Sequence, residues 1–401
     1  MKNLNKVNNY RGFSLAWVIG IVVVTSIISA ITAGVIVYNN NKLSYDTTYG
    51  DLSNDKDLNE FLSVYANILS SYYEDVDTGA LLDQAIAGMM DYLGDDYTTY
   101  LDDESTAELF DSLSGEYTGI GVSINNSDKS IVKVYKDTPA SKAGIQEGDI
   151  IVGFNDTDVT NMTATEVVNL IKGSNDYFTL RLQRGTQTIS VSLKNETLIA
   201  PNIDYYMVEN TNIGYLSLQT FSNTLATQVK DALNELEKSG MKSLIIDLRN
   251  NTGGYLTAAT DVANMFLEKG KRIYGLNYQN NITNFNDETS EHKEYEIVVL
   301  INENTASASE ILAAALKESY GATLVGETSF GKGKVQQTMK LDDGSMVKYT
   351  SAYWLTPNGT CIDGIGINPD YYIVNEEVTD EAGNITIPDA QLNKAIEVLQ
   401  E

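Results

Sequence analysis

The chain has 401 residues, a formal net charge of −28 at pH 7, and 42% hydrophobic residues with only 5 prolines. This length predicts two or three folded units, and the apolar content excludes a disordered chain. The acidity argues against nucleic acid as a partner, because phosphate contacts need clustered lysine and arginine. With one cysteine (Cys361) and one histidine (His292), an intrachain disulfide, a multi-cysteine zinc site and a two-histidine metal site are excluded.

Residues 13–38 form an apolar run without a charged residue. At about 1.5 Å per residue the run is long enough to cross a hydrocarbon core of about 30 Å. Lys2, Lys6 and Arg11 precede it, so the positive-inside rule predicts a cytoplasmic tail over 1–12, a single-pass signal anchor in the cell membrane over 13–38, and an extracytoplasmic catalytic part. The alternative is a cleaved signal peptide, but the run is longer than a usual h-region.

Residues 39–54 are polar and are interpreted as a linker, and residues 55–102 as a helical region. Within the latter, apolar residues recur at helical spacing from Phe61 to Tyr72 and again from Leu81 to Met89. The pattern predicts two amphipathic helices whose apolar faces pack within the protein or on a partner subunit.

Residues 103–195 predict a compact β-rich module with two helices, because short alternating segments replace the helical spacing. Its notable feature is the run Thr118, Gly119, Ile120, Gly121 and Val122, where two glycines precede an apolar strand. Such a turn can aim backbone N–H groups at a peptide carboxylate, although Gly-x-Gly alone is weak evidence. With its surroundings, the module resembles a PDZ domain, in which the strand after Gly121 would accept a peptide.

Residues 196–375 alternate strands with helices and predict an α/β domain, followed by a C-terminal segment over 376–401 with one short helix. In this domain the stretch from Asp247 to Gly254 (DLRNNTGG) opens a buried strand into a glycine turn. Glycines there let backbone N–H groups face a developing negative charge. The alternative is a routine turn between strand and helix.

Ser307 lies at a predicted junction between a strand and an alanine-rich helix, within TASASEI. A serine there can be a nucleophile, because its hydroxyl is exposed beside the N–H groups of a helix start. The alternative is helix capping, since Glu310 follows three residues later.

Lys332 lies in GETSFGKGKVQ, which begins like a phosphate-binding loop. The match fails at Gly333, where serine or threonine is needed for Mg²⁺, and the residues that follow alternate like a strand. A lysine there could instead be a general base, provided that desolvation lowers its pKa. Spacing alone does not choose between Lys332 and Lys334.

Together these motifs resemble the carboxyl-terminal processing (tail-specific) peptidases from about residue 56 to the C-terminus. The resemblance implies a crotonase-like (ββα) α/β protease core with an inserted PDZ domain, proteolysis without metal or cofactor, protein substrates recognised through their C-termini, and a homodimer supported by the helical region. Asp96 replaces a frequent proline, and Thr305 replaces a serine. The implied site consists of Ser307 as nucleophile, Lys332 as base, Gln336 as the residue that orients the lysine, and Ala308 with Gly253 or Gly254 as oxyanion donors.

Two other functions are compatible with parts of the sequence. One is an inactive scaffold that only binds C-termini through residues 103–195, against which the intact Ser307, Lys332 and Gln336 argue. The other is a hydrolase that uses His292, but this residue lies in a charged stretch typical of an exposed surface.

Overall fold

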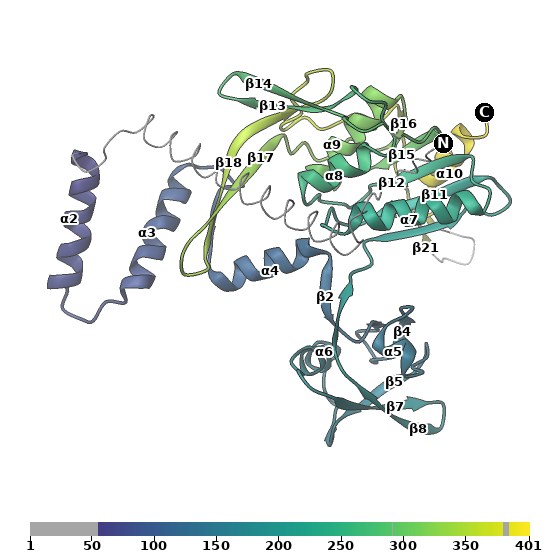
Figure 1. Cartoon of the computed structure of the whole chain (residues 1–401), viewed down its shortest axis with the longest axis horizontal. Coiled ribbons are helices and arrows are strands. Elements are labelled where there is room, and N and C mark those ends of the chain that lie inside the picture. Colours follow the sequence, from purple (N-terminus) through teal and green to yellow (C-terminus); the bar gives the residue numbers. More distant parts are fainter. Residues whose placement is uncertain (1–54, 291, 380–384) are drawn as a thin grey trace, which may run out of the picture. The chain divides into compact units, whose positions relative to one another are not determined.

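A computed structural model of the chain describes residues 55–290, 292–379 and 385–401 (Figure 1). The chain divides into two compact units, residues 1–85 and residues 86–401.

The described part of the first unit is helical, as the sequence predicts. Helix α2 (Lys56–Ser71) begins after Asp55, whose carboxylate accepts a hydrogen bond from the N–H of Leu58 at 2.9 Å. Helix α3 (Thr78–Tyr92) follows and runs on into the second unit. The apolar side chains of α2 are largely exposed, among them Leu62 at 50%, so this helix carries an apolar face without a covering layer in the described chain.

The predicted fold class needs one correction, because it included a single transmembrane helix. In the part of the chain that the structure describes, no helix is long and apolar enough to cross a membrane. Helix α2, for example, has 16 residues, whereas a span needs about 20 that are mainly apolar. The run over 13–38 on which the prediction depended, with the tail over 1–12 and the linker over 39–54, lies outside the described residues.

The second unit contains the PDZ-type module, whose two ends meet in a ribbon of β2 (Glu116–Gly119) and β9 (Glu196–Ile199). A separate pair joins β3 (Val122–Ile124) to β4 (Ile131–Val134), and a four-stranded sheet has the order β6-β5-β7-β8. The remaining elements are α5 (Pro139–Lys142), β5 (Ile150–Phe154), β6 (Thr157–Asp158), α6 (Ala164–Lys172), β7 (Phe178–Arg184) and β8 (Gln187–Leu193). The two predicted helices are present, but α4 (Asp103–Ser114) precedes the module as an additional helix.

A six-stranded sheet forms the centre of the α/β domain, in the order β10-β11-β12-β15-β16-β19. All of its pairs are parallel except β10 with β11. Its strands are β10 (Ile203–Met207), β11 (Ile213–Leu218), β12 (Ser243–Asp247), β15 (Glu296–Ile301), β16 (Thr323–Gly326) and β19 (Tyr371–Tyr372).

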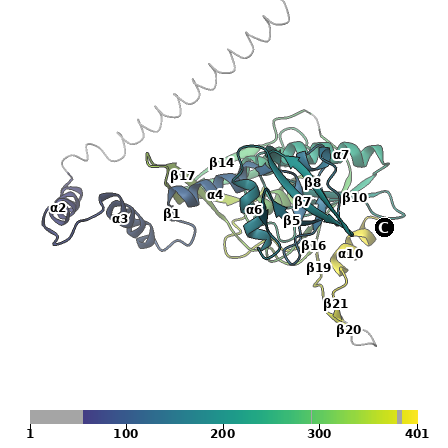
Figure 2. The ribbon, with the colours of Figure 1, turned by 90° about the horizontal axis from the view of Figure 1, so that it is seen from below.

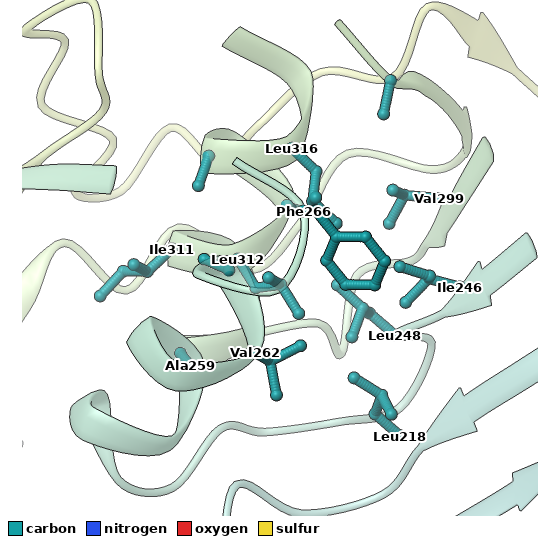
Figure 3. Close-up of a cluster of buried hydrophobic side chains, with 14 of the residues drawn as sticks. Leu218, Ile246, Leu248, Ala259, Val262, Phe266, Val299, Ile311, Leu312 and Leu316 are labelled. Carbon is teal, nitrogen blue, oxygen red and sulfur yellow. The ribbon is translucent and has the colours of Figure 1, made fainter. Parts of the chain in front are cut away.

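Helices cover both faces of this sheet. On one face α7 (Leu225–Lys238), α8 (Leu256–Ala263) and α9 (Ala308–Ala315) bury a cluster centred on Phe266, with Val262 and Leu312 around it (Figure 3). A π-helical turn, η2 (Leu316–Tyr320), continues α9. On the other face α10 (Ala390–Val398) packs against β15 and β16 (Figure 2). The central strands β12 and β15 are therefore buried on both sides, which explains their continuous apolar sequences, whereas the edge strands β10 and β19 are largely exposed.

A second sheet lies beside this core and has the order β1-β18-β13-β14, with β17 also paired to β18. Strands β17 (Lys334–Lys340) and β18 (Met346–Leu355) form the hairpin that the sequence predicts at Asp343 and Gly344. The other strands are β1 (Thr99–Leu101), β13 (Arg272–Tyr278) and β14 (Asn281–Asn286), and a small hairpin joins β20 (Val378–Thr379) to β21 (Ile385–Thr386).

Candidate active site

Ser307 occupies a strained turn between β15 and α9. Its φ of 59° and ψ of −118° are rare for a residue other than glycine, and such a conformation costs about 1–3 kcal/mol. Its N–H donates to Oε2 of Glu310 at 2.8 Å, and its carbonyl oxygen accepts from the N–H of Glu310 at 2.9 Å and of Ile311 at 3.0 Å. The hydrogen bonds that start helix α9 also keep Ser307 in its strained conformation. Ser307 can therefore cap the helix and still be a reactive serine.

Glu310 is the buried acceptor that holds this region together. Its side chain is 0% exposed. Oε1 accepts from the hydroxyl of Ser329 at 2.6 Å and from the N–H of Gly331 at 2.7 Å; Oε2 accepts from the N–H groups of Ser307 at 2.8 Å and Lys332 at 2.9 Å. Burial raises the pKa of Glu310, and the four hydrogen bonds oppose that shift. Since an N–H can only donate, this arrangement fits the ionised carboxylate.

The backbone around Lys332 is fixed from the other side by Trp354. The indole N–H of Trp354 donates to the carbonyl oxygen of Lys332 at 2.8 Å. The backbone N–H of Trp354 donates to the carbonyl oxygen of Gly333 at 2.9 Å. A Cβ at Gly333 would lie 2.6 Å from Cβ of Asp363, so only glycine fits there. These contacts fix the backbone of Lys332 and Gly333.

The amine of Lys332 lies in a partly dry environment. Its Nζ is 4.4 Å from the ring centroid of Tyr97. Burial, followed by the charge of Lys348, lowers the pKa of Lys332, while Glu310 and Asp95 oppose the shift. The amine can therefore lose its proton at a lower pH than an exposed lysine, as a general base requires.

Lys334 has the opposite character. Its Nζ forms an ion pair with Asp95 at 2.8 Å, and this hydrogen bond raises the pKa of Lys334. A lysine held in its charged form is a poor base. Of the two lysines that the sequence leaves open, Lys332 thus has the environment that proton abstraction needs.

Gln336 does not contact this base in the structure. Its Nε2 donates to the carbonyl oxygen of Lys334 at 3.2 Å and to the hydroxyl of Thr350 at 3.4 Å, beside a β-bulge between Val335 and Gln336. No hydrogen bond joins Gln336 to Lys332 among the described residues. Its role in orienting the lysine stays a prediction.

Asn251 organises the predicted oxyanion segment. It is 1% exposed. Its Nδ2 donates to the carbonyl oxygen of Leu218 at 2.8 Å, and its Oδ1 accepts from the N–H of Gly253 at 2.9 Å. Its own carbonyl oxygen accepts from the N–H of Ala306 at 3.0 Å and the hydroxyl of Ser309 at 2.9 Å. The turn after β12 and the turn that carries Ser307 are therefore one hydrogen-bonded assembly.

Both glycines of this segment are sterically required. Gly253 has a φ of 103°, and a Cβ on it would lie 3.0 Å from Cβ of Ser307 and 3.0 Å from the nitrogen of Ala308. Gly254 has a φ of 143°, and its Cβ would lie 2.4 Å from the carbonyl oxygen of Phe221. The first-turn N–H of Ala308 has no acceptor within its helix. The segment thus brings Gly253 directly against Ser307 and this N–H.

The predicted peptide-binding residues lie between β2 and β3. Gly119 ends β2, Ile120 is buried at 3%, and Gly121 has a φ of 83° at which a Cβ would lie 2.3 Å from Cβ of Thr138. Strand β3 begins at Val122 and pairs only with β4 in the described chain. Its other edge can accept an extended peptide.

Other sequence motifs do not join the site. The Nε2 of His292 faces Glu294 at 3.2 Å in a surface segment. The N–H groups of Gly331 and Lys332 bond Glu310, so they are not offered to a phosphate. No cluster of three histidine, cysteine or acidic residues suited to a metal occurs over the described ranges.

The sequence did not identify Tyr97, Trp354 or Asp363 as parts of the site, and it considered Glu310 only as a helix-cap partner. For Glu310 a signal was present, since a carboxylate three residues after a candidate nucleophile suggested a capping box. Tyr97 and Trp354 contact Lys332, and Asp363 contacts Gly333, only through the tertiary fold, and nothing local marks these residues.

A serine at a strained strand–helix junction beside a glycine turn suits a nucleophile, and its N–H shares one acceptor with the N–H of a partly buried lysine. Family models agree: residues 212–373 match peptidase family S41, residues 107–183 match the PDZ domain, and residues 29–105 match the N-terminal domain of the activating protease CtpB.

Relatives extend the likeness over most of the chain. The carboxy-terminal processing protease CtpA of Bacillus subtilis (strain 168) is 39% identical over 368 residues, or 90% of this chain and 77% of the relative. A probable CtpA-like serine protease of Staphylococcus aureus (strain N315) is 36% identical over 88% of this chain and 72% of the relative. The solved photosystem II D1 C-terminal processing protease is 29% identical over 82% of this chain and 90% of that one, with a TM-score of 0.48. The chain belongs to peptidase family S41, and it is a C-terminal processing serine protease with a PDZ domain.

Substitution of Glu310 tests the assembly of the site. In Glu310→Gln an amide nitrogen would face two of the four hydrogen-bond donors, so we expect kcat/KM for a peptide substrate to fall about 100-fold, as for a displaced reacting group. Glu310→Asp keeps the charge and should lose less. The matched control is Glu303→Gln on the exposed turn before Ser307. Wild-type activity in a folded Glu310→Gln protein would contradict this role.

Proposed function

We propose that this protease cleaves protein substrates with a dyad of Ser307 and Lys332. The neutral amine of Lys332 accepts the hydroxyl proton while Oγ of Ser307 attacks the scissile carbonyl carbon. The lysine then gives this proton to the leaving amine as the peptide C–N bond breaks and an acyl-enzyme forms. Water attacks the ester in the second half, again with Lys332 as base, and restores the serine.

One observation carries this proposal. A single oxygen of Glu310 accepts the N–H groups of both Ser307 and Lys332, at 2.8 and 2.9 Å. Two residues 25 positions apart in sequence are therefore fixed to one buried atom. The lowered pKa of Lys332 supports it as the base.

For the oxyanion we propose the N–H of Ala308 together with that of Gly254, because the N–H of Gly253 already donates to Oδ1 of Asn251. The neighbouring Gly253 packs against the nitrogen of Ala308, which supports this pairing. Backbone donors that are already fixed stabilise the developing charge without reorganisation during the reaction.

For substrate recognition we propose that the PDZ module binds the C-terminal residues of a protein through the segment Gly119 to Val122. The open edge of β3 supports addition of the tail as a further strand. Main-chain hydrogen bonds would then provide affinity, and the turn before the strand would receive the terminal carboxylate. Cleavage would follow at a site that the bound tail brings to Ser307.

The dyad predicts a defined activity and pH profile for the full chain. Ser307→Ala and Lys332→Ala should each lower kcat/KM for an unstructured protein with an apolar C-terminus by at least about 10⁴-fold, and Lys332→Arg should too, because guanidinium stays protonated. In the wild type, activity should rise with pH as Lys332 loses its proton, with a midpoint below the ordinary lysine value of about 10.4.

Lys340→Ala is the matched control, since Lys340 is exposed on the same strand β17. Chelators should have no effect on turnover. Activity that survives in Ser307→Ala would place the nucleophile elsewhere. Tail binding without cleavage by the wild type would instead favour a scaffold that only binds C-termini.

Tail recognition predicts dependence on the free carboxylate of the substrate. A substrate peptide with an amidated C-terminus should be cleaved with a KM at least about tenfold higher, because a charged hydrogen-bond partner is worth about 1.5–3 kcal/mol. Its kcat should change little if the tail only docks. The control is the KM of the Gly121→Val variant for the amidated peptide. In this variant the added side chain meets Thr138. Equal KM for acid and amide in the wild type would exclude carboxylate recognition.

We also propose a homodimer through the helical region, supported by the exposed apolar side chains of α2. Sedimentation of the full chain over a range of concentrations tests it, and a monomer throughout would refute it.

The extracytoplasmic location is proposed from the charges of Lys2, Lys6 and Arg11 alone. Labelling of Cys361 in intact cells by an impermeant thiol reagent tests that location.

A further inference from the structure

The segment from Gly94 to Leu101 follows α3 and leads into the sheet whose strand β17 begins two residues after Lys332. Its end forms strand β1, which pairs antiparallel with β18 so that Thr99 lies opposite Lys348. Just before the strand, the hydroxyl of Thr98 accepts the N–H of Thr350 at 3.0 Å. The segment therefore lies on the β17–β18 hairpin (Figure 1).

Asp95 fastens the other end of the same segment. Its carboxylate binds Nζ of Lys334 at 2.8 Å, the hydroxyl of Thr98 at 2.6 Å and the hydroxyl of Thr350 at 2.5 Å. Burial opposes ionisation, but these hydrogen bonds lower the pKa of Asp95 to about 2. The carboxylate of Asp95 therefore stays ionised over the whole pH range in which a protease is assayed.

Tyr97 lies between these two anchors. Its ring centroid is 4.4 Å from Nζ of Lys332 and 5.5 Å from Nζ of Lys334. The ring is only partly exposed. The anchors on both sides leave it little freedom to swing away, so the aromatic ring lies as a cover on the amine of the lysine.

Several charged groups act on Lys332 and come from different elements. These are Asp95 from the covering segment, Lys348 from β18 and Glu310 from α9. Nearby, Lys334 of β17 pairs with Asp95, and Asp363 accepts the N–H of Gly333. The acidic groups favour the ammonium form and Lys348 disfavours it. Since these charges oppose one another, exclusion of water decides which form prevails.

Resting on the proposed dyad, we propose that Tyr97 is a positioning residue for Lys332: its ring covers the amine and excludes water from it, and Asp95 and Thr98 hold the ring in place. The segment from Gly94 to Leu101 thereby contributes to a site that is otherwise built by residues 247–363.

An aromatic face could also act in the other direction, by attracting the ammonium form. That attraction is worth about 0.5–1 kcal/mol at an exposed site, whereas burial can shift a lysine by several pKa units. The pKa of Lys332 is lowered, with burial as the largest cause, so covering prevails over attraction. Because the ring and not the hydroxyl provides the cover, phenylalanine should replace Tyr97 without effect.

The test measures peptide cleavage and the rate of fluorophosphonate labelling of Ser307 by the full chain as functions of pH. In Tyr97→Ala we expect the acidic limb of both profiles to move to higher pH by about 1 unit, with activity recovering at high pH. Tyr97→Phe should keep the wild-type limb. Thr98→Val, which loosens the segment without changing a charge, should shift it in the same direction but less.

Tyr278→Ala is the control, because Tyr278 is 52% exposed at the end of β13, and its profile should match the wild type. An unchanged limb in Tyr97→Ala would overturn the inference, and a limb at lower pH would show that the ring favours the ammonium form. If Tyr97→Ala does not fold, Thr98→Val decides by the same criterion.

The dyad variants separate this inference from the proposed dyad. If Ser307→Ala and Lys332→Ala lose activity while the profile of Tyr97→Ala is unchanged, only this inference fails. If the dyad variants keep activity, the proposed dyad itself fails.

Discussion

The structure depends on one buried carboxylate. Glu310 stands in the first turn of α9 and accepts four hydrogen bonds with no exposure to water. An unpaired charge in that position would be very costly, and each donor that it gains offsets part of the cost. Three of those donors are backbone N–H groups of the turns that carry Ser307 and Lys332. The energetic need to satisfy one anion therefore fixes the geometry of both turns, which neither a helix nor a strand could hold.

The same principle explains the strained backbone and the glycines around it. Ser307 adopts a conformation that its own side chain disfavours, and it persists because Glu310, Asn251 and the start of α9 determine the surrounding turns. Gly253, Gly254 and Gly333 permit close approaches that a Cβ would block. Strain at Ser307 and small residues beside it are consequences of packing three turns around one point.

The sequence predicted the elements whose signals are local. Apolar strands alternating with helices gave the α/β core, and Asp343 with Gly344 marked the hairpin of β17 and β18. It missed α4, whose polar sequence gave no apolar stripe, and it did not foresee the strand pair β13 and β14. The single transmembrane helix of the predicted fold class was wrong, because no helix among the described residues is long and apolar enough to span a membrane; the run over 13–38 lies outside them. Ser307, Lys332 and the glycines of the oxyanion segment could be proposed because each lies in a recognisable motif.

What the sequence could not provide are contacts between distant segments. Arg249 shows why: its guanidinium binds Asp247 two residues away, but also both carboxylate oxygens of Asp389, 140 positions on, at 2.7 and 2.9 Å. Asp389 in turn caps α10 through the N–H of Leu392 at 3.0 Å. No local pattern announces such a pair, and the same holds for Asp95 with Lys334, 239 positions apart.

These distant contacts join both ends of the second unit to the catalytic turns. The segment at Asp95 and Tyr97 lies on the lysine side, and the cap of α10 at Asp389 binds Arg249, two residues before Asn251 in the oxyanion segment. Arg249 is 13% exposed, so without Asp389 its buried guanidinium would keep Asp247 as its one carboxylate partner among the described residues. A buried charge that has lost part of its pairing is destabilising. The turn at Gly253 and Gly254 is therefore fully stabilised only when helix α10 is docked. The catalytic geometry is thus a property of the completed fold rather than of the segment from Asp247 to Lys332, although that segment supplies every group proposed to take part in the chemistry.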